Sequence, residues 1–157
     1  MEKKMAFSDD RGGFSFECAD AKMSLGSSTW NTRLSQIGSM AGHMYVMTRR
    51  LPGTDYISKI ISKRPRDISI IANYEAREAA EILKSRFPDI HVALHSHNNA
   101  KVALIAPGTV WVSGADFGEG EGPGWIDAAV GMHSEDLFKR TYEDLFLKLW
   151  RESQELE

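Results

Sequence analysis

The stretch from Leu94 to Gly118 constrains the fold more than any other part of this sequence. Two short apolar runs, Val102–Ala106 and Val110–Val112, flank Pro107-Gly108, and this pairing of Pro with Gly between β-branched runs indicates a turn between two strands. A hairpin places its outer ends side by side. We therefore expect the polar residues before the first run and after the second run to meet at one edge of a sheet.

The polar residues at the two outer ends of the predicted hairpin are the candidates for a site. Side chains alternate between the two faces of a strand, so every second residue of an extended segment points the same way. If the entering segment is extended, four polar residues share one face: His95, His97, Asn99 and Lys101. The residues that leave the hairpin are Ser113, Gly114 and Asp116.

Length and composition restrict the class of protein. The chain has 157 residues, which suits one domain that buries about two thirds of its unfolded surface. It contains no apolar run near the ~20 residues of a membrane span and no signal peptide, so no membrane partner is expected. Its single cysteine, Cys18, fits a reducing, cytoplasmic setting and is expected to be a small core residue. The net charge of −3 argues against a protein that coats nucleic acid through charge alone.

The rest of the chain alternates strand and helix patterns, which predicts an α/β domain with a largely parallel sheet. The predicted strands are Phe14–Met23, His43–Thr48, Ile68–Ala72, Ile90–Leu94 and Trp125–Met132. The predicted helices run from Asn31 or Thr32 to about Ala41, from Thr54 or Asp55 to Lys63, over Glu75–Phe87, and onward from an N-cap at Ser134.

The order of these elements and the two ends of the hairpin resemble the phospholipase D superfamily. That family carries His-x-Lys at the start of one strand and Gly-Ser-x-Asn at the end of the next. Here Asn99-Ala100-Lys101 and Ser113-Gly114-Ala115-Asp116 occupy those positions. The resemblance covers roughly residues 25–156 and looks like the single-module, nuclease-type branch from bacteria and phage. It implies a mixed, largely parallel sheet flanked by helices in one domain, 25–157, after an N-terminal segment, 1–24, that could add an edge strand.

The family's chemistry defines what the resemblance implies for this chain. One histidine attacks a phosphodiester, a second from the other module protonates the leaving oxygen, and Lys and Asn hold the phosphate oxygens without a metal. The resemblance therefore implies a homodimer whose motif ends meet, phosphate contacts from Lys101 and Ser113, and no cofactor. Asp127 roughly matches an acidic position that orients the histidine. The same likeness suggests a phage or mobile-element origin.

Two departures from the family pattern predict a degraded active site. Asn99 stands where the family has its nucleophile, and an amide can only hydrogen-bond. Asp116 replaces a neutral amide, and its negative charge would repel a phosphate. Lys101, set in an apolar strand, needs a partner, and Asp116 across the hairpin is the expected one. The leading prediction is a protein that acts by binding nucleic acid or a protein partner.

Two catalytic alternatives stay open. In the first, His97 lies one pleat, ~7 Å, from the nucleophile position and serves with Lys101 in a metal-independent phosphodiesterase or endonuclease. In the second, His95 and His97 bind a metal with Asp116 and Asp127 in a metal-dependent hydrolase. The plainer interpretation is that both histidines are exposed polar residues of a loop.

Basic residues cluster at Arg49, Arg50, Lys63 and Arg64. Such a cluster could hold the backbone of DNA or RNA, because phosphate contacts from Lys and Arg supply most of the affinity for nucleic acid. The other interpretation is the solvated face of a helix.

Overall fold

A computed structural model describes residues 6–27, 40–119 and 126–157 of the chain. The strands are β1 (Asp20–Ser27), β2 (Met44–Met47), β3 (Ile68–Ala72), β4 (His91–Leu94), β5 (Val102–Ile105), β6 (Thr109–Ser113), β7 (Ile126–His133) and β8 (Gln154–Glu155). The helical segments are α2 (Thr54–Ser62), η1 (Tyr74–Ala76), α3 (Arg77–Arg86), α4 (Glu135–Thr141), η2 (Tyr142–Phe146) and α5 (Leu147–Glu152).

The strands form one sheet in the order β1-β7-β6-β5-β2-β3-β4-β8. The sheet is mixed, as expected, but the prediction of a largely parallel sheet is wrong. Among the strands that the structure describes, β2–β3 and β3–β4 pair in parallel, and the other neighbouring strands pair antiparallel. The physical reason lies in the connections: α2 and η1–α3 carry the chain back between parallel strands, whereas β5 returns directly into β6.

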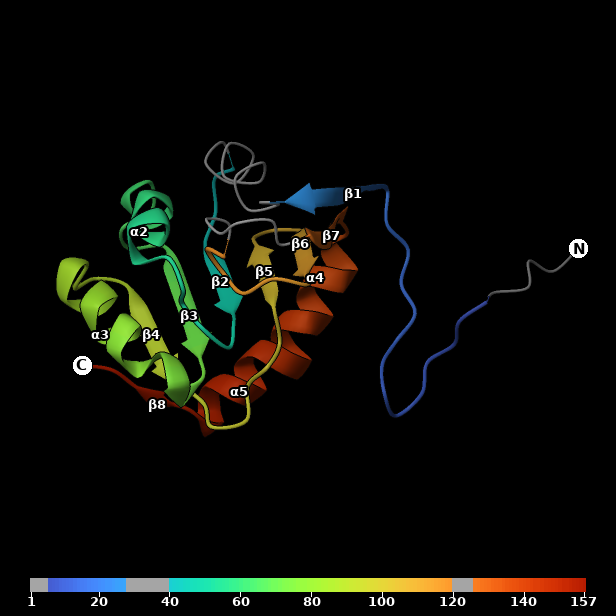
Figure 1. Cartoon of the computed structure of the whole chain (residues 1–157). Helices are drawn as coiled ribbons and strands as arrows, with labels where there is room; N and C mark the ends of the chain where they lie inside the picture. Colours follow the sequence, from blue (N-terminus) through green and yellow to red (C-terminus); the bar gives the residue numbers. More distant parts are fainter. Residues whose placement is uncertain (1–5, 28–39, 120–125) are drawn as a thin grey trace, which may run out of the picture.

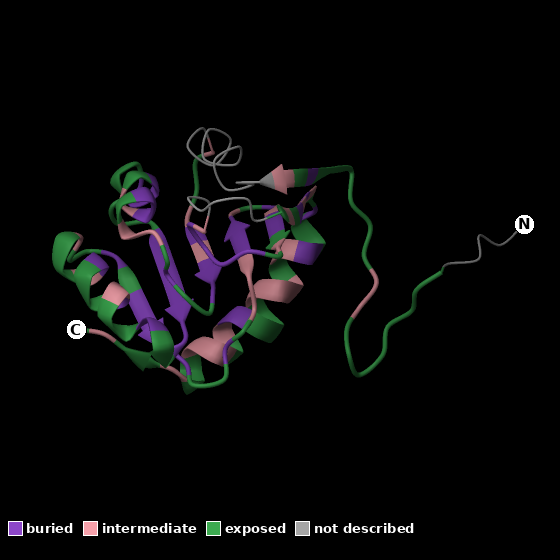
Figure 2. Ribbon diagram, viewed as in Figure 1, coloured by how far each residue is buried: buried purple, intermediate pink, exposed green. Residues whose placement is uncertain are grey.

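Helices α2 and α3 cover one face of the sheet (Figure 1). All five residues of β3 are buried, which explains why this strand is a continuous apolar run rather than an alternating one. The side chains that α2 buries against the sheet recur at helical spacing: Tyr56, Ile57, Ile60 and Ile61. Figure 2 shows this buried layer running through the middle strands.

The helical stretch α4–η2–α5 covers the opposite face of the sheet (Figure 1). Leu137 and Phe146 are buried there against Met47, Leu104 and Val110. The prediction that Ser134 caps this helix is confirmed, since its side chain accepts a hydrogen bond from the backbone N–H of Leu137 at 3.1 Å.

Replacing Ser134 with alanine should lower the free energy of unfolding by about 1 kcal/mol, because the N–H of Leu137 loses its acceptor in a buried position. Urea unfolding at neutral pH measures this change. Ser134→Asp is the matched control and should retain most of the stability, since aspartate also caps helices. An alanine variant as stable as the wild type would contradict the capping role.

The structure corrects two expectations about the N-terminal half, the bounds of the first strand and the burial of Cys18. The first strand is Asp20–Ser27 and not Phe14–Met23, so residues 14–19 are irregular. This β1 is an edge strand of the sheet and crosses the boundary drawn between residues 24 and 25. Cys18 is exposed and not in the core, and it lies in the irregular segment before β1. The helix expected from Asn31 or Thr32 to Ala41 lies almost wholly outside the described residues.

Within the described ranges, no helix has both the length and the apolar character needed to cross a membrane.

Candidate functional site at the motif edge

One end of the sheet gathers the segments that the sequence singled out. The chain leaves β2, β3, β4 and β6 at this end and enters β5 and β7 there, as the strand directions require. We call this end the motif edge and define it by residues 48–50, 73–75, 95–101, 113–119 and 126–128.

The predicted hairpin is confirmed. Strands β5 and β6 pair antiparallel, with Val102 opposite Val112. Just beyond this pair, the backbone N–H of Ser113 donates to the carbonyl of Lys101 at 2.9 Å. The two polar ends of the hairpin therefore lie side by side, as the sequence indicated.

Asp127 approaches the hairpin at Gly114. The N–H of Gly114 donates to the carbonyl of Ala128 at 3.0 Å, and a Cβ built on Gly114 would lie 2.5 Å from Oδ1 of Asp127. A side chain at position 114 would therefore displace the Asp127 carboxylate. The inverted Ser113-Gly114 order leaves room for Asp127 at the motif edge.

The segment that enters the hairpin is a loop and not an extended strand, so the condition for a shared face is not met. Residues 96–97 form a turn, and β5 begins only at Val102. His95 is buried, while His97 and Asn99 are exposed. These three side chains and Lys101 consequently do not line one face of a strand.

Asn98 explains the loop. Its buried Nδ2 donates to the backbone carbonyls of Thr48 at 2.9 Å and Ile71 at 3.1 Å. Its Oδ1 accepts from the N–H of Ala100 at 3.0 Å, and Asn73 donates to its carbonyl at 3.1 Å. A buried amide with its hydrogen-bonding capacity used in this way holds the loop to the ends of β2 and β3.

His95 has both ring nitrogens engaged. Its Nδ1 accepts from the backbone N–H of His97 at 3.0 Å, which places the proton on Nε2, and Nε2 lies 2.9 Å from Oε2 of Glu152. This hydrogen bond lowers the pKa of the Glu152 carboxyl below its usual value. His95 therefore ties the end of β4 to the end of α5 and offers no ring nitrogen lone pair to a metal.

The other predicted residues of the loop face solvent with few partners. The ring Nδ1 of His97 lies 3.0 Å from the hydroxyl of Ser96. Lys101 is partly exposed, and its Nζ lies 3.4 Å from the carbonyl of Gly114. In the part of the chain that the structure describes, no group of three or more His, Cys, Asp or Glu side chains could hold a metal ion.

Asp116 is fully buried, with 0 % of its surface exposed. Its Oδ1 accepts from the backbone N–H groups of Arg49 at 2.9 Å and Arg50 at 3.2 Å, and the hydroxyl of Thr48 lies 3.1 Å away. Its Oδ2 accepts from Nε of Arg50 at 3.0 Å. The expected ion pair with Lys101 is replaced by one with Arg50, because the end of β2 carries Arg50 directly over the carboxylate.

The charge of Asp116 is stabilised within the fold. Burial acts to raise the pKa of this carboxyl, but the hydrogen bonds from Arg50 and Arg49 and the nearby charge of Lys101 together lower the pKa below its usual value. Asp116 is therefore ionised at neutral pH and sits inside the protein, where it is not directly presented to a ligand.

This lowered pKa predicts a pH dependence. A carboxyl whose pKa is lower in the folded state stabilises the protein above its unfolded pKa, about 3.9, and loses that effect as the pH falls through the folded pKa. The wild type should exceed Asp116→Asn in free energy of unfolding by a constant amount above about pH 5, and the difference should shrink below about pH 4. Urea unfolding of both proteins from pH 7 to pH 3 measures this. A difference that stays constant over the whole range would contradict the assignment.

The structure divides the predicted basic cluster. Arg49 and Arg50 lie at the motif edge. The guanidinium of Arg49 forms a bidentate pair with Glu75, in which Nη2 donates to Oε1 at 2.7 Å and Nε donates to Oε2 at 3.1 Å. Lys63 and Arg64 follow α2 at the opposite end of β2. Arg64 is buried, and its guanidinium donates at 2.7 Å to the carbonyls of Met40 and Gly42. Arg64 is a structural residue, and the four cations do not form one patch.

Sequence reasoning did not identify Thr48, Asn73 and Asn98, nor the pairing of Arg50 with Asp116. Each of the three polar residues lies shortly after a buried strand. This position in the sequence could have indicated that they belong to the motif edge. A hollow of about 430 Å³ lies elsewhere, between α3 and the C-terminal segment, and its lining contains none of the predicted site residues.

Comparison with known proteins gives structural matches alone. No family model matches the sequence, and a search of curated proteins finds no match. The fold is similar to that of Nuc, a phospholipase D family member from Salmonella typhimurium, with a TM-score of 0.72 and 15% identity over 88% of this chain and 99% of that one. NucT from Helicobacter pylori gives a TM-score of 0.68 and 16% identity over 87% and 100%.

A third similar structure belongs to TrmBL2, an archaeal chromatin protein with a novel mode of DNA binding. Its TM-score is 0.62 at 10% identity, over 87% of this chain and 53% of TrmBL2. The structural similarity establishes the fold, and identities this low leave the activity open. The chain has the phospholipase D fold that its motifs suggested.

Proposed function

We propose that this chain is a phospholipase D-like module that binds the phosphodiester backbone of a nucleic acid at the motif edge without cleaving it. The observation that carries the proposal is Asn99, an exposed amide at the position where the resemblance places the attacking histidine. An amide neither attacks phosphorus nor transfers a proton at neutral pH. The position retains only the capacity to hydrogen-bond a ligand.

Two exposed cations support binding at this edge. Lys101 matches the family's phosphate-binding lysine, and Arg50 lies at the end of β2, next to the strand that Lys101 precedes. TrmBL2, which is similar to this chain over 53% of its own length, binds DNA, and this makes nucleic acid the first ligand to test. Because the net charge of the chain is −3, we expect the phosphate contacts at this local pair of cations and not over the whole surface.

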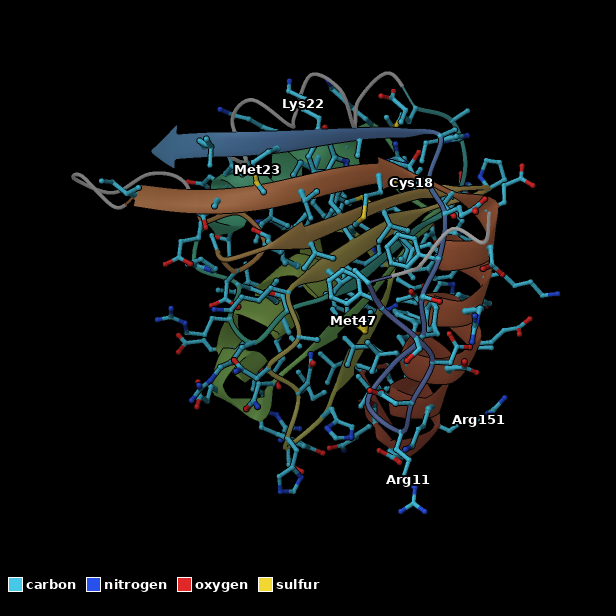
Figure 3. The ribbon with its side chains drawn as sticks, turned by 90° about the vertical axis from the view of Figure 1, so that its right-hand side faces the viewer. Arg11, Cys18, Lys22, Met23, Met47 and Arg151 are labelled. Carbon is cyan, nitrogen blue, oxygen red and sulfur yellow. The ribbon has the colours of Figure 1, made fainter. Side chains whose placement is uncertain are left out.

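The proposed assembly is a homodimer joined along the motif edge and the apolar face beside it. The pairing of β1 with β7 and of β7 with β6 puts Met23, Val130 and Val112 on one side of the sheet, with Leu25 and Ile126 further along the same side. Leu25 is 78% exposed and Ile126 is 88% exposed. Figure 3 looks onto this side, with Met23 on β1 at its margin. A contiguous exposed apolar area of this kind marks an interaction surface.

A hydrolase that uses His97 and Lys101 is the second candidate, since His97 is exposed at the same edge. This candidate is less well supported because the His97 ring is not held in place. Among the described residues, His97 has no carboxylate partner to set its tautomer and position its ring. Cleavage in EDTA that disappears in His97→Ala would support that candidate, and cleavage only with added metal would support a metal-dependent hydrolase.

Fluorescence anisotropy with labelled 12-mers of single- and double-stranded DNA and RNA tests the proposal. Binding should weaken as salt rises, and a dimer that contacts phosphate with Arg50 and Lys101 from each copy should give a slope of log K against log salt of about −3 to −4. Absence of binding at low salt to every oligonucleotide would overturn the proposal and leave a protein partner as the alternative.

A further inference from the structure

The buried carboxylate at position 116 has a structural task in this chain. The resemblance places a neutral amide there that holds phosphate, and a carboxylate in its place would be expected to repel the ligand. Asp116 is instead fully buried, with both oxygens engaged by residues 48–50. Its negative charge is matched by Arg50, so the group that this position presents to solvent is a guanidinium.

Arg50 is fixed at two points. Its backbone N–H donates to Oδ1 of Asp116, and its side-chain Nε donates to Oδ2 of the same carboxylate. The side chain remains 55% exposed, and the pair occupies only one of its N–H groups. A guanidinium carries five N–H donors in a planar fork, so its terminal nitrogens can donate to a second anion beside the buried carboxylate.

Lys101 lies at the same motif edge, with its Nζ 3.4 Å from the carbonyl of Gly114, and its charge helps to lower the pKa of Asp116. Glu119 is the competing anion: its Oε2 accepts from the N–H of Asp116 at 3.0 Å, and its Oε1 lies 3.7 Å from Nη2 of Arg50. Because Glu119 is partly exposed, a phosphate could take over this weak contact without disturbing the buried pair.

We propose that Asp116 is a positioning residue that aims Arg50 outward, and that Arg50 together with Lys101 forms the phosphodiester-binding group of this protein. The inference rests on the proposed function and adds which residues recognise the phosphate. Under this proposal, the aspartate at position 116, where the family has asparagine, favours anion binding. The carboxylate acts through Arg50 and does not repel the phosphate.

The substitution Asp116→Asn distinguishes two roles for position 116: an amide that holds phosphate, as in the family, and a carboxylate that positions Arg50. Asparagine can still accept the two backbone N–H groups through Oδ1, but its Nδ2 is a donor and would face the Nε–H donor of Arg50. Arg50 would then be released from its fixed direction. A site that worked as the family's does would gain affinity from the restored amide, whereas this site should lose it.

The experiment measures binding of a labelled single-stranded 12-mer to the full chain and to its variants, by anisotropy across a salt series. Arg50→Ala should weaken binding about 10- to 100-fold and reduce the salt slope by about one for each Arg50 removed. Asp116→Asn should weaken binding in the same direction, and the double variant should bind no more weakly than Arg50→Ala alone. Glu119→Gln should strengthen binding, because a competing anion is removed.

Arg49→Ala is the matched control, since Arg49 is the adjacent cation and its guanidinium is taken up by Glu75. It should change affinity less than Arg50→Ala. Unfolding curves accompany every variant, and the double variant leaves no unpaired buried charge. Tighter binding by Asp116→Asn, or unchanged binding by Arg50→Ala, overturns this inference and leaves the proposed function standing. No binding by the wild type overturns both.

Discussion

Replacing Asp116 with alanine should lower the free energy of unfolding by about 2–4 kcal/mol, among the larger effects of a single substitution in this chain. The carboxylate is the acceptor for the backbone N–H groups of Arg49 and Arg50, and it anchors the end of β2 to the loop after β6. Alanine leaves these donors without their acceptor. Arg50 itself contributes little to the loss, because its half-exposed guanidinium can be rehydrated.

Urea unfolding at pH 7 measures this effect, and Asp116→Asn is the control. Asparagine keeps an acceptor for the two backbone groups, so it should cost clearly less than alanine. Equal losses for the two variants would mean that the ion pair, and not the backbone anchor, carries the stability. A loss below 1 kcal/mol for alanine would contradict the structural role assigned to this residue.

Replacing Leu25 and Ile126 with aspartate should separate the proposed dimer. Both side chains are exposed in the single chain, so their replacement should leave folding nearly unchanged. In a dimer they would enter the apolar contact, where a charge should raise the dissociation constant by about 30-fold or more. Sedimentation equilibrium over a range of protein concentrations measures the shift.

Lys22→Asp provides the comparison for the dimer experiment. Lys22 lies on the same strand between Ala21 and Met23, so its side chain points to the other side of the sheet. It should leave self-association unchanged. A wild-type chain that stays monomeric at high concentration, or a Lys22→Asp effect as large as that of the aspartate substitutions at positions 25 and 126, would contradict the proposed interface.

Much of the fold follows from local sequence signals. The continuous apolar run of β3, the hairpin around Pro107-Gly108 and the cap at Ser134 each depend on neighbouring residues, and the structure confirms all three. The share of parallel pairing was overestimated, because strand order depends on how distant segments connect and not on the pattern within a strand. The start of β1 was misplaced because β1 is an edge strand with exposed apolar residues. Phe16 before the strand and Met23 and Leu25 within it are all exposed, so apolar residues do not mark where the strand begins.

The candidate site was less accessible to sequence reasoning. The hairpin explained why the ends near Lys101 and Ser113 meet, since a turn brings its flanks together. The partner of Asp116 could not be found in this way, because Arg50 lies 66 residues earlier in the chain and reaches the site only through the antiparallel pairing of β2 with β5. The loop at residues 95–101 depends in the same way on the carbonyls of Thr48 and Ile71, which no local pattern reveals.

The most direct test of the central claim incubates one labelled oligonucleotide with the protein in EDTA at low salt and records binding and cleavage in the same sample. We predict that the oligonucleotide is bound, is released by salt and remains intact after long incubation, with or without added divalent metal. Cleavage in EDTA that His97→Ala abolishes would contradict it and would show that the motif edge is an active site rebuilt around His97.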